Sequence, residues 1–124
     1  MDHTEVRSWV DAYEQVWRSP GTDRLAELFA EDASYQVSPC EEPLLGLAAI
    51  GDLWETERAG PGEDFTMTSE VVAVDGWVAV VRAEVDYAAT GSRWRDLWVL
   101  RFADDGRCTA FEEWPFAPDQ PDGH

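Results

Sequence analysis

The sequence contains no lysine, and all nine of its basic residues are arginine. This absence excludes Schiff-base chemistry on a lysine, a phosphate-loop lysine and a lysine nucleophile. Positive charge is scarce as well, since nine basic residues stand against 26 acidic ones and the net charge is −17. Such a charge repels the phosphates of nucleic acids and anionic lipid surfaces. We therefore expect neither a nucleic acid nor a membrane among its partners.

Histidine and cysteine are also rare. The two histidines, His3 and His124, lie near the ends of the sequence, where chains are usually mobile. The two cysteines, Cys40 and Cys108, are too few for a disulfide framework. The acidic pairs lack the spacing of a calcium loop, and the sequence has no glycine-rich phosphate loop or dinucleotide fingerprint. We therefore expect no metal site and no cofactor.

Long apolar runs are absent too. None approaches the ~20 residues that a membrane-spanning helix needs, and the first residues lack the basic and then apolar pattern of a signal peptide. The cytoplasm is therefore the expected location. A length of 124 residues with 44% hydrophobic residues suits one globular domain with a full core. We predict this domain over residues 1–116, followed by a loose tail at residues 117–124.

Apolar residues at helical spacing predict three helices in the first half of the chain. Asp2 and Glu5 have capping-box spacing at the start of the first helix, and Ser-Pro-Gly at residues 19–21 ends it. The second helix is short and ends at residues 31–32, and Gly-Pro-Gly at residues 60–62 ends the third. The three apolar faces are Val6, Val10, Tyr13 and Trp17; Leu25, Leu28 and Phe29; and Leu47, Ile50, Leu53 and Trp54.

The second half is rich in residues typical of strands. Strands are predicted over residues 33–37, 65–74, 77–88, 93–103 and 108–114, and Asp-Gly at residues 75–76 is a strong signal for a two-residue hairpin turn. Helices segregated from a run of hairpin-connected strands predict an α+β fold. Because long strands twist and coil, we expect a cone-shaped, curved antiparallel sheet with the three helices packed on its concave face. The mouth of such a cone is a natural apolar ligand cavity.

Three segments carry a resemblance to a known family: LAELFAEDASY at residues 25–35, LGLAAI at residues 45–50 and DLWVLRF at residues 96–102. They are similar to the first strand with its preceding short helix, the entry to the third helix and the last strands of the nuclear transport factor 2-like superfamily. The resemblance is to its SnoaL-like members in particular, which have a cystatin-like α+β barrel, and it covers residues 6–116. The superfamily includes isomerases, dehydratases, cyclases, epoxide hydrolases and many non-enzymes, so the resemblance implies a fold without choosing an activity.

One class of this superfamily, the ketosteroid isomerases, has a catalytic pattern that can be compared with the sequence. The resemblance places its tyrosine on Tyr13, which matches. It places the two aspartates of the pattern on Val37 and Trp98, neither of which can exchange a proton. Ketosteroid isomerase activity is therefore not expected.

The same resemblance implies which strand residues point into the cone, and the alternation of small apolar with charged residues agrees. Asp96 is expected beside Trp98 on an apolar face, where lost hydration raises a carboxylate's pKa and suits it to carry a proton. Glu113 is the expected second carboxylate, or Glu112 if a bulge shifts the last strand. Tyr13 is expected to donate a hydrogen bond to a developing oxyanion.

Each of these residues has a plain structural alternative. Asp96 can form an ion pair with Arg93, Arg95 or Arg101, or lie at the wet rim of the cone. A glutamate can be a charge that protects an edge strand from aggregation. A buried tyrosine usually only satisfies its hydroxyl within the core.

Large side chains are expected to line the cavity and contact a ligand, although each alone is as well explained by plain core packing. Their number favours a ligand site, since a small domain seldom needs so many rings to fill its interior. The predicted ligand-binding residues are Trp17, Phe29, Tyr35, Trp54, Met67, Trp98 and Phe111.

Leu97, Val99 and Trp114 are expected to form an apolar stripe on the outer face of the sheet, and such a stripe requires a cover. SnoaL-like proteins commonly pair through this sheet, so the resemblance implies a homodimer. The alternative cover is the C-terminal tail.

The chain is accordingly expected to bind an apolar, cyclic small molecule in an aromatic-lined cone. If it is an enzyme, the resemblance implies cofactor-free acid–base catalysis such as isomerisation, aldol cyclisation or dehydration. The alternatives are a non-catalytic ligand carrier, a dimeric scaffold whose pocket is only core, and an accessory domain of a larger complex.

Overall fold

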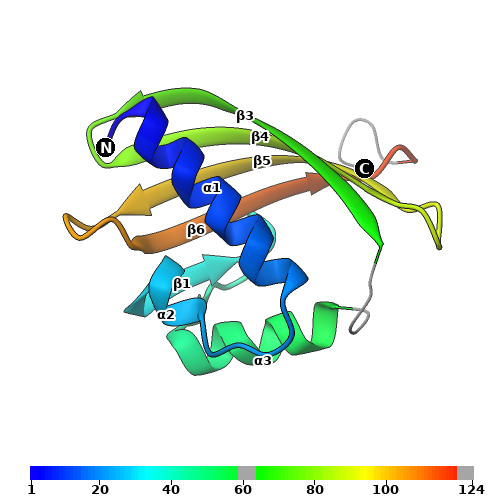
Figure 1. The fold of residues 1–124 in the computed structure, drawn as a ribbon, viewed down its shortest axis with the longest axis horizontal. Coiled ribbons are helices and arrows are strands. Elements are labelled where there is room, and N and C mark those ends of the chain that lie inside the picture. Colours follow the sequence, from blue (N-terminus) through cyan, green and yellow to red (C-terminus); the bar gives the residue numbers. More distant parts are fainter. Residues whose placement is uncertain (59–63, 120–124) are drawn as a thin grey trace.

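Helices cover one face of a curved sheet (Figure 1). The computed structural model describes residues 1–58 and 64–119. Its elements in chain order are α1 (His3–Arg18), α2 (Leu25–Leu28), β1 (Phe29–Gln36), β2 (Leu44–Leu45), α3 (Leu47–Glu57), β3 (Phe65–Asp75), β4 (Val78–Tyr87), β5 (Arg93–Phe102) and β6 (Cys108–Phe116).

The strands form one open sheet in the order β2-β1-β6-β5-β4-β3. The four long strands β3 to β6 follow one another as an antiparallel meander. β1 then lies parallel to β6, and β2 pairs with its outer edge. Register shifts within β3, within β1 and between β5 and β6 bend the sheet. The predicted α+β fold, with a curved sheet and N-terminal helices on its concave face, is confirmed.

Helix α1 begins and ends where its sequence predicts. The Asp2 side chain accepts a hydrogen bond from the backbone N–H of Glu5 at 2.8 Å, and Ser19 caps the other end. Its buried face packs on the sheet, and the indole of Trp9 donates to the backbone carbonyl of Leu28 at 2.9 Å. This bond ties α1 to α2 within the core.

Helix α2 is shorter than predicted. It ends at Leu28 and not at residues 31–32, and β1 begins at Phe29, four residues before the predicted start of that strand. The reason is tertiary: β1 pairs with β6, with Phe29 opposite Cys108. A helix-forming segment that gains a strand partner follows the partner and not its own propensity. The two-residue strand β2 was not predicted.

The β3–β4 hairpin turns one residue later than predicted. Asp75 pairs with Val78, which leaves Gly76 and Trp77 in the turn in place of residues 75–76. Gly76 has φ 60°, a backbone conformation that favours glycine. The predicted end of the third helix at residues 60–62 lies outside the described residues, as do residues 120–124 of the predicted tail.

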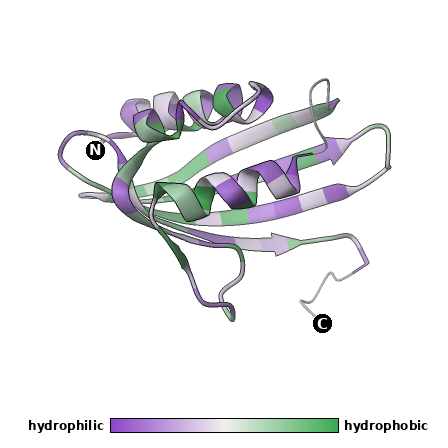
Figure 2. Cartoon of the chain, turned by 90° about the horizontal axis from the view of Figure 1, so that it is seen from below, coloured by the Kyte–Doolittle hydropathy of each residue, from purple (hydrophilic) through white to green (hydrophobic). Residues whose placement is uncertain are grey.

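Apolar and charged residues alternate along the strands, as Figure 2 shows in green and purple. On β4, Ala79, Val81 and Ala83 are buried against the helices, whereas Arg82 and Glu84 are exposed on the outer face. The predicted inner and outer faces of this strand are therefore confirmed. No helix within the described residues is long and apolar enough to cross a membrane.

Candidate functional site

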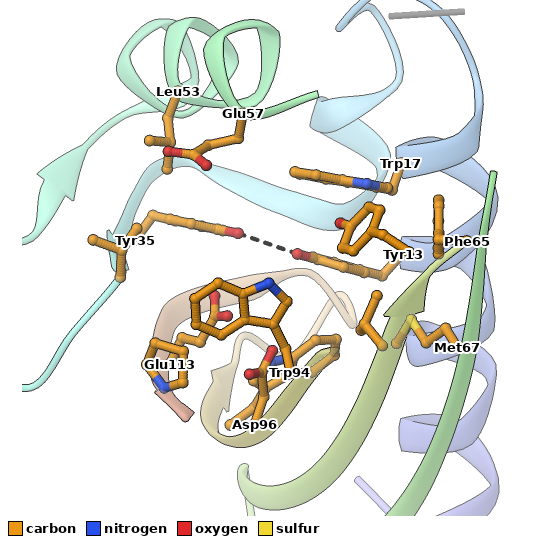
Figure 3. A pocket seen from close by; sticks show the side chains of 15 residues that line it. Tyr13, Trp17, Tyr35, Leu53, Glu57, Phe65, Met67, Trp94, Asp96 and Glu113 are labelled. Carbon is orange, nitrogen blue, oxygen red and sulfur yellow. Dashed lines mark hydrogen bonds between the residues drawn. The ribbon is translucent and has the colours of Figure 1, made fainter. Parts of the chain in front are cut away.

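A pocket of about 270 Å³ opens between the concave face of the sheet and the ends of α1 and α3 (Figure 3). Every layer of the fold contributes to its wall. Among the lining residues are Tyr13 and Trp17 of α1, Tyr35 of β1, Leu53 and Glu57 of α3, Phe65 and Met67 of β3, Trp94, Asp96 and Trp98 of β5, and Glu113 of β6. The volume is near the lower end of the range for small-molecule sites.

The structure brings part of the predicted aromatic wall to this pocket. Of the seven predicted ligand-binding residues, Trp17, Tyr35, Met67 and Trp98 line it. Phe29, Trp54 and Phe111 do not line it; they are buried in the core behind it. Phe111 stacks against the rings of Tyr35 and Tyr13, with centroids 4.5 and 5.6 Å apart. These three residues thus hold the wall in place without forming its surface.

Asp96 is the charged side chain that is most deeply placed among the described residues, at 7% exposure. Its Oδ1 atom is buried and has no hydrogen-bond partner. The expected alternative, an ion pair with a neighbouring arginine, is not found, because Arg93 and Arg95 pair with Asp86 and Glu84 on the outer face. Burial raises the pKa of Asp96.

Glu113 lies directly across from Trp98 and faces the pocket. Its neighbour Glu112 points the other way, where its carboxylate accepts a hydrogen bond from the indole of Trp114 at 2.5 Å. Of the two glutamates that the sequence left open, Glu113 is therefore the pocket residue.

Burial raises the pKa of Glu113 well above its ordinary value, and the negative charges of Asp96 and Glu57 raise it further. The neighbouring Glu113 carboxyl and Trp98 indole partly oppose this effect of burial on the pKa of Asp96. The pKa of Glu113 is raised more strongly than that of Asp96, so Glu113 is the carboxyl of the pair that favours the proton. Two carboxyls whose environments separate their protonation states can act as acid and base.

Two tyrosine hydroxyls meet at the pocket wall. The Oη atoms of Tyr13 and Tyr35 lie 3.1 Å apart within hydrogen-bonding distance, and both side chains are buried (Figure 3). Burial raises the pKa of both phenols, so both stay protonated at neutral pH. Since two hydroxyls share one mutual hydrogen bond, the second proton remains available to a ligand oxygen.

Glu57 was not singled out from the sequence. It extends from the last turn of α3 into the pocket wall, four residues after Leu53, which also lines the pocket. Residues four apart share a helix face, so the position of Leu53 on the apolar face of α3 was the signal that could have identified Glu57. Within the described residues, no group of three or more histidine, cysteine or carboxylate side chains is arranged to hold a metal ion.

Comparisons with known proteins agree with this architecture. The model of the SnoaL-like domain family matches residues 6–111. A proposed polyketide cyclase from Sinorhizobium meliloti is 25% identical, with 91% of this chain and 99% of that chain covered and a TM-score of 0.69. No curated protein matches the chain.

Two further solved structures share the fold at lower identity. SalBIII, an epoxide hydrolase/cyclase-like enzyme in pyran ring formation in the polyether salinomycin, is 15% identical over 93% of each chain, with a TM-score of 0.73. A steroid delta-isomerase from Pseudomonas aeruginosa is 18% identical, over 93% of this chain and 82% of that chain, with a TM-score of 0.65. Relatives of one fold thus carry different activities.

Proposed function

This chain belongs to the SnoaL-like domain family, and we propose that its pocket binds a small, apolar, cyclic carbonyl compound and transfers a proton on it without a cofactor. The pocket volume of about 270 Å³ suits a molecule of one or two rings. Tryptophan and tyrosine rings form much of the wall, and these bury large apolar area while their polar atoms remain available.

The observation that carries this proposal is the unpartnered Oδ1 of Asp96. A buried hydrogen-bond acceptor without a partner costs about 1–3 kcal/mol of folding free energy. A buried polar atom of this kind on a pocket wall is typical of functional positions, where a ligand atom can supply the partner. The indole Nε1 of Trp98, which also lines the pocket, is likewise buried without a partner.

The proposed reaction uses three groups. The Asp96 carboxylate removes a proton from the carbon next to the carbonyl, and the electron pair of the broken C–H bond moves to the carbonyl oxygen. The hydroxyl pair of Tyr13 and Tyr35 donates a hydrogen bond to that oxygen, which stabilises the negative charge. Glu113 then gives its proton to the second reacting position, and the proton on Asp96 passes to Glu113 and restores the pair. Isomerisation, aldol cyclisation and dehydration all share these steps.

Steroid isomerisation by the pattern of the ketosteroid isomerases is not part of this proposal. Val37 lines the pocket at the position where the resemblance places the general base. Trp98 occupies the second position, so the proton carrier of this chain would be Asp96 on β5 instead.

We also propose the cytoplasm as the location of this protein, since Cys40 and Cys108 are both free thiols.

Proton exchange tests this function directly. A panel of cyclic ketones and diketones in deuterium oxide is followed by nuclear magnetic resonance for loss of the proton next to the carbonyl. We expect the protein to accelerate exchange for at least one of them. Asp96→Asn should lower that rate by about 10²–10⁴-fold while circular dichroism stays unchanged.

The matched control is Asp86→Asn, which removes the same charge on the outer face of β4 and should leave the rate unchanged. An Asp96→Asn variant with full exchange activity would refute the assignment of Asp96. Ligand binding detected by tryptophan fluorescence, with no exchange for any ketone, would favour the non-catalytic carrier.

A further inference from the structure

The polar groups of the pocket are unbalanced in charge. Among the described residues, three carboxyl side chains line it, Glu57, Asp96 and Glu113, and no arginine or histidine does. Figure 3 shows Glu57 extending from α3 on one side, while Asp96 and Glu113 lie on the opposite side. A positive charge between these walls is attracted from both sides, and a negative charge is repelled from both.

Glu57 is an exposed residue at the edge of the pocket, and its place on α3 is electrostatically unfavourable for a carboxylate. It lies at the C-terminal end of α3, where the helix dipole is negative and a carboxylate is destabilising. The adjacent arginine does not neutralise it, because the Arg58 side chain pairs with Glu55 and donates to the backbone carbonyls of Ser19 and Gly21. Glu57 makes no ion pair with any described residue, and its charge acts on Glu113 across the pocket.

A second observation, on the opposite wall, points to a ligand in the same pocket. Asp96, which is more than nine-tenths buried, lines the pocket with an oxygen that has no partner. Two aromatic rings that line the pocket already contact positive charge. The Arg18 guanidinium lies 3.8 Å from the centroid of the Phe65 ring, and the Arg58 guanidinium lies 6.0 Å from the centroid of the Trp17 ring. Aromatic faces bind ammonium groups in the same way.

We propose that the pocket selects ligands in which a protonated amine is attached to a compact apolar ring, and that Glu57 is the specificity residue that binds the ammonium group. This inference rests on the proposed function, because it assigns the substrate class of the same pocket. The ring lies against the tryptophans, and the acid pair remains free to act on the carbonyl. Carboxylates, phosphates and other anions are disfavoured as ligands.

Three probes of similar size and different charge test this inference: benzylamine, benzyl alcohol and benzoate. Binding at neutral pH is followed by quenching of tryptophan fluorescence and by isothermal titration calorimetry. We expect benzylamine to bind at least about tenfold more tightly than benzyl alcohol, and benzoate to show no saturable binding. Glu57→Gln should remove most of the preference for benzylamine over benzyl alcohol.

Asp52→Asn is the matched control, since it removes the same charge from an exposed position of α3 outside the pocket and should change neither affinity. Equal or tighter binding of benzyl alcohol or benzoate overturns the amine preference and leaves the proposed pocket function standing. A preference that survives in Glu57→Gln overturns the role of that residue. Failure of all three probes to bind overturns both the preference and the proposed function.

Discussion

At the scale of the residue, the sequence predicted the carboxyl pair but not the whole wall. The resemblance, with which the alternation of side chains agreed, assigned Asp96 to the inner face and left Glu113 and Glu112 open as its partner; the structure has Asp96 and Glu113 at the pocket. Alternation reports which face a side chain is on and not how deep it lies, so it did not separate Trp98 at the surface of the pocket from Phe111 behind it. Glu57 was missed because a glutamate at the end of a helix is usually a solvated charge, although it shares a helix face with Leu53, four residues earlier.

The raised pKa of Glu113 makes a prediction about stability and pH. Burial raises the pKa of this carboxyl in the folded state above its pKa in the unfolded chain. Its full contribution to stability is therefore present below the unfolded-state pKa, and this contribution is lost as pH rises through the folded-state pKa. The free energy of unfolding should therefore fall as pH rises above about 4.3, the ordinary pKa of a glutamate. In Glu113→Gln, which cannot ionise, urea denaturation should show a smaller fall, with the remainder due to Asp96.

Glu112→Gln serves as the control for that measurement, since Glu112 lies beside Trp114 and away from the pocket. Its unfolding free energy should depend on pH as that of the unmodified chain does. A Glu113→Gln variant with the unmodified pH dependence would contradict the buried, protonated state of this residue.

The tyrosine pair predicts an energetic coupling. Replacing Tyr13 or Tyr35 with phenylalanine leaves one buried hydroxyl without its partner, and each change should cost about 1–3 kcal/mol of unfolding free energy. The double variant should cost less than the sum of the two, by about 1 kcal/mol in a double-mutant cycle. Additive costs would show that the 3.1 Å contact contributes nothing.

At the scale of the element, local sequence signals predicted the helices and the long strands, whereas the boundary between α2 and β1 depends on pairing with a strand far along the chain. The limits of α1 follow from its own cap and from the residues after it. The boundary between α2 and β1 depends instead on β6, which pairs with Phe29 from far along the chain. No local pattern at residues 29–32 contains that information, so the predicted helix ran on into the strand.

The end of α3 gives a prediction at this scale. Arg58 donates to the carbonyls of Ser19 and Gly21, and its side chain is only 8% exposed. Hydrogen bonds from a charged group contribute about 1.5–3 kcal/mol, so Arg58→Met should lower the unfolding free energy by about that amount in urea denaturation.

Arg24→Met is the comparison, because Arg24 forms an exposed ion pair with Glu27 at 2.8 Å. Exposed pairs contribute about 0–1 kcal/mol, so this variant should be nearly as stable as the unmodified chain. If both variants lose the same stability, Arg58 does not anchor α3 to the segment that follows α1.

At the scale of the whole molecule, the outer face of the sheet carries an apolar pair. Leu97 and Trp114 lie opposite each other on β5 and β6, with 36% and 39% exposure. The half-buried Val99 continues this stripe. We propose that a second copy of the chain covers it, since a sheet face with exposed large apolar residues is typical of an interface.

Size-exclusion chromatography with light scattering tests this proposal. The unmodified chain should elute as a dimer, and Leu97→Glu should shift it to the monomer because a carboxylate cannot be buried unpaired in the interface. Leu45→Glu, at an exposed position on the edge strand β2 and away from this stripe, should remain dimeric. A monomeric unmodified chain would favour the C-terminal tail as the cover.

The parallel pairing of β1 with β6 has a consequence for biosynthesis. The chain leaves the ribosome from its N-terminus, so the aromatic residues of α1 and β1 are synthesised long before β6, the strand against which they pack. Phe111 of β6 stacks against Tyr35, so this face of the Tyr35 ring gains its native contact only after β6 has emerged. The nascent polypeptide therefore reaches its native state only after translation of β6. Until then its exposed aromatic side chains can aggregate with other chains.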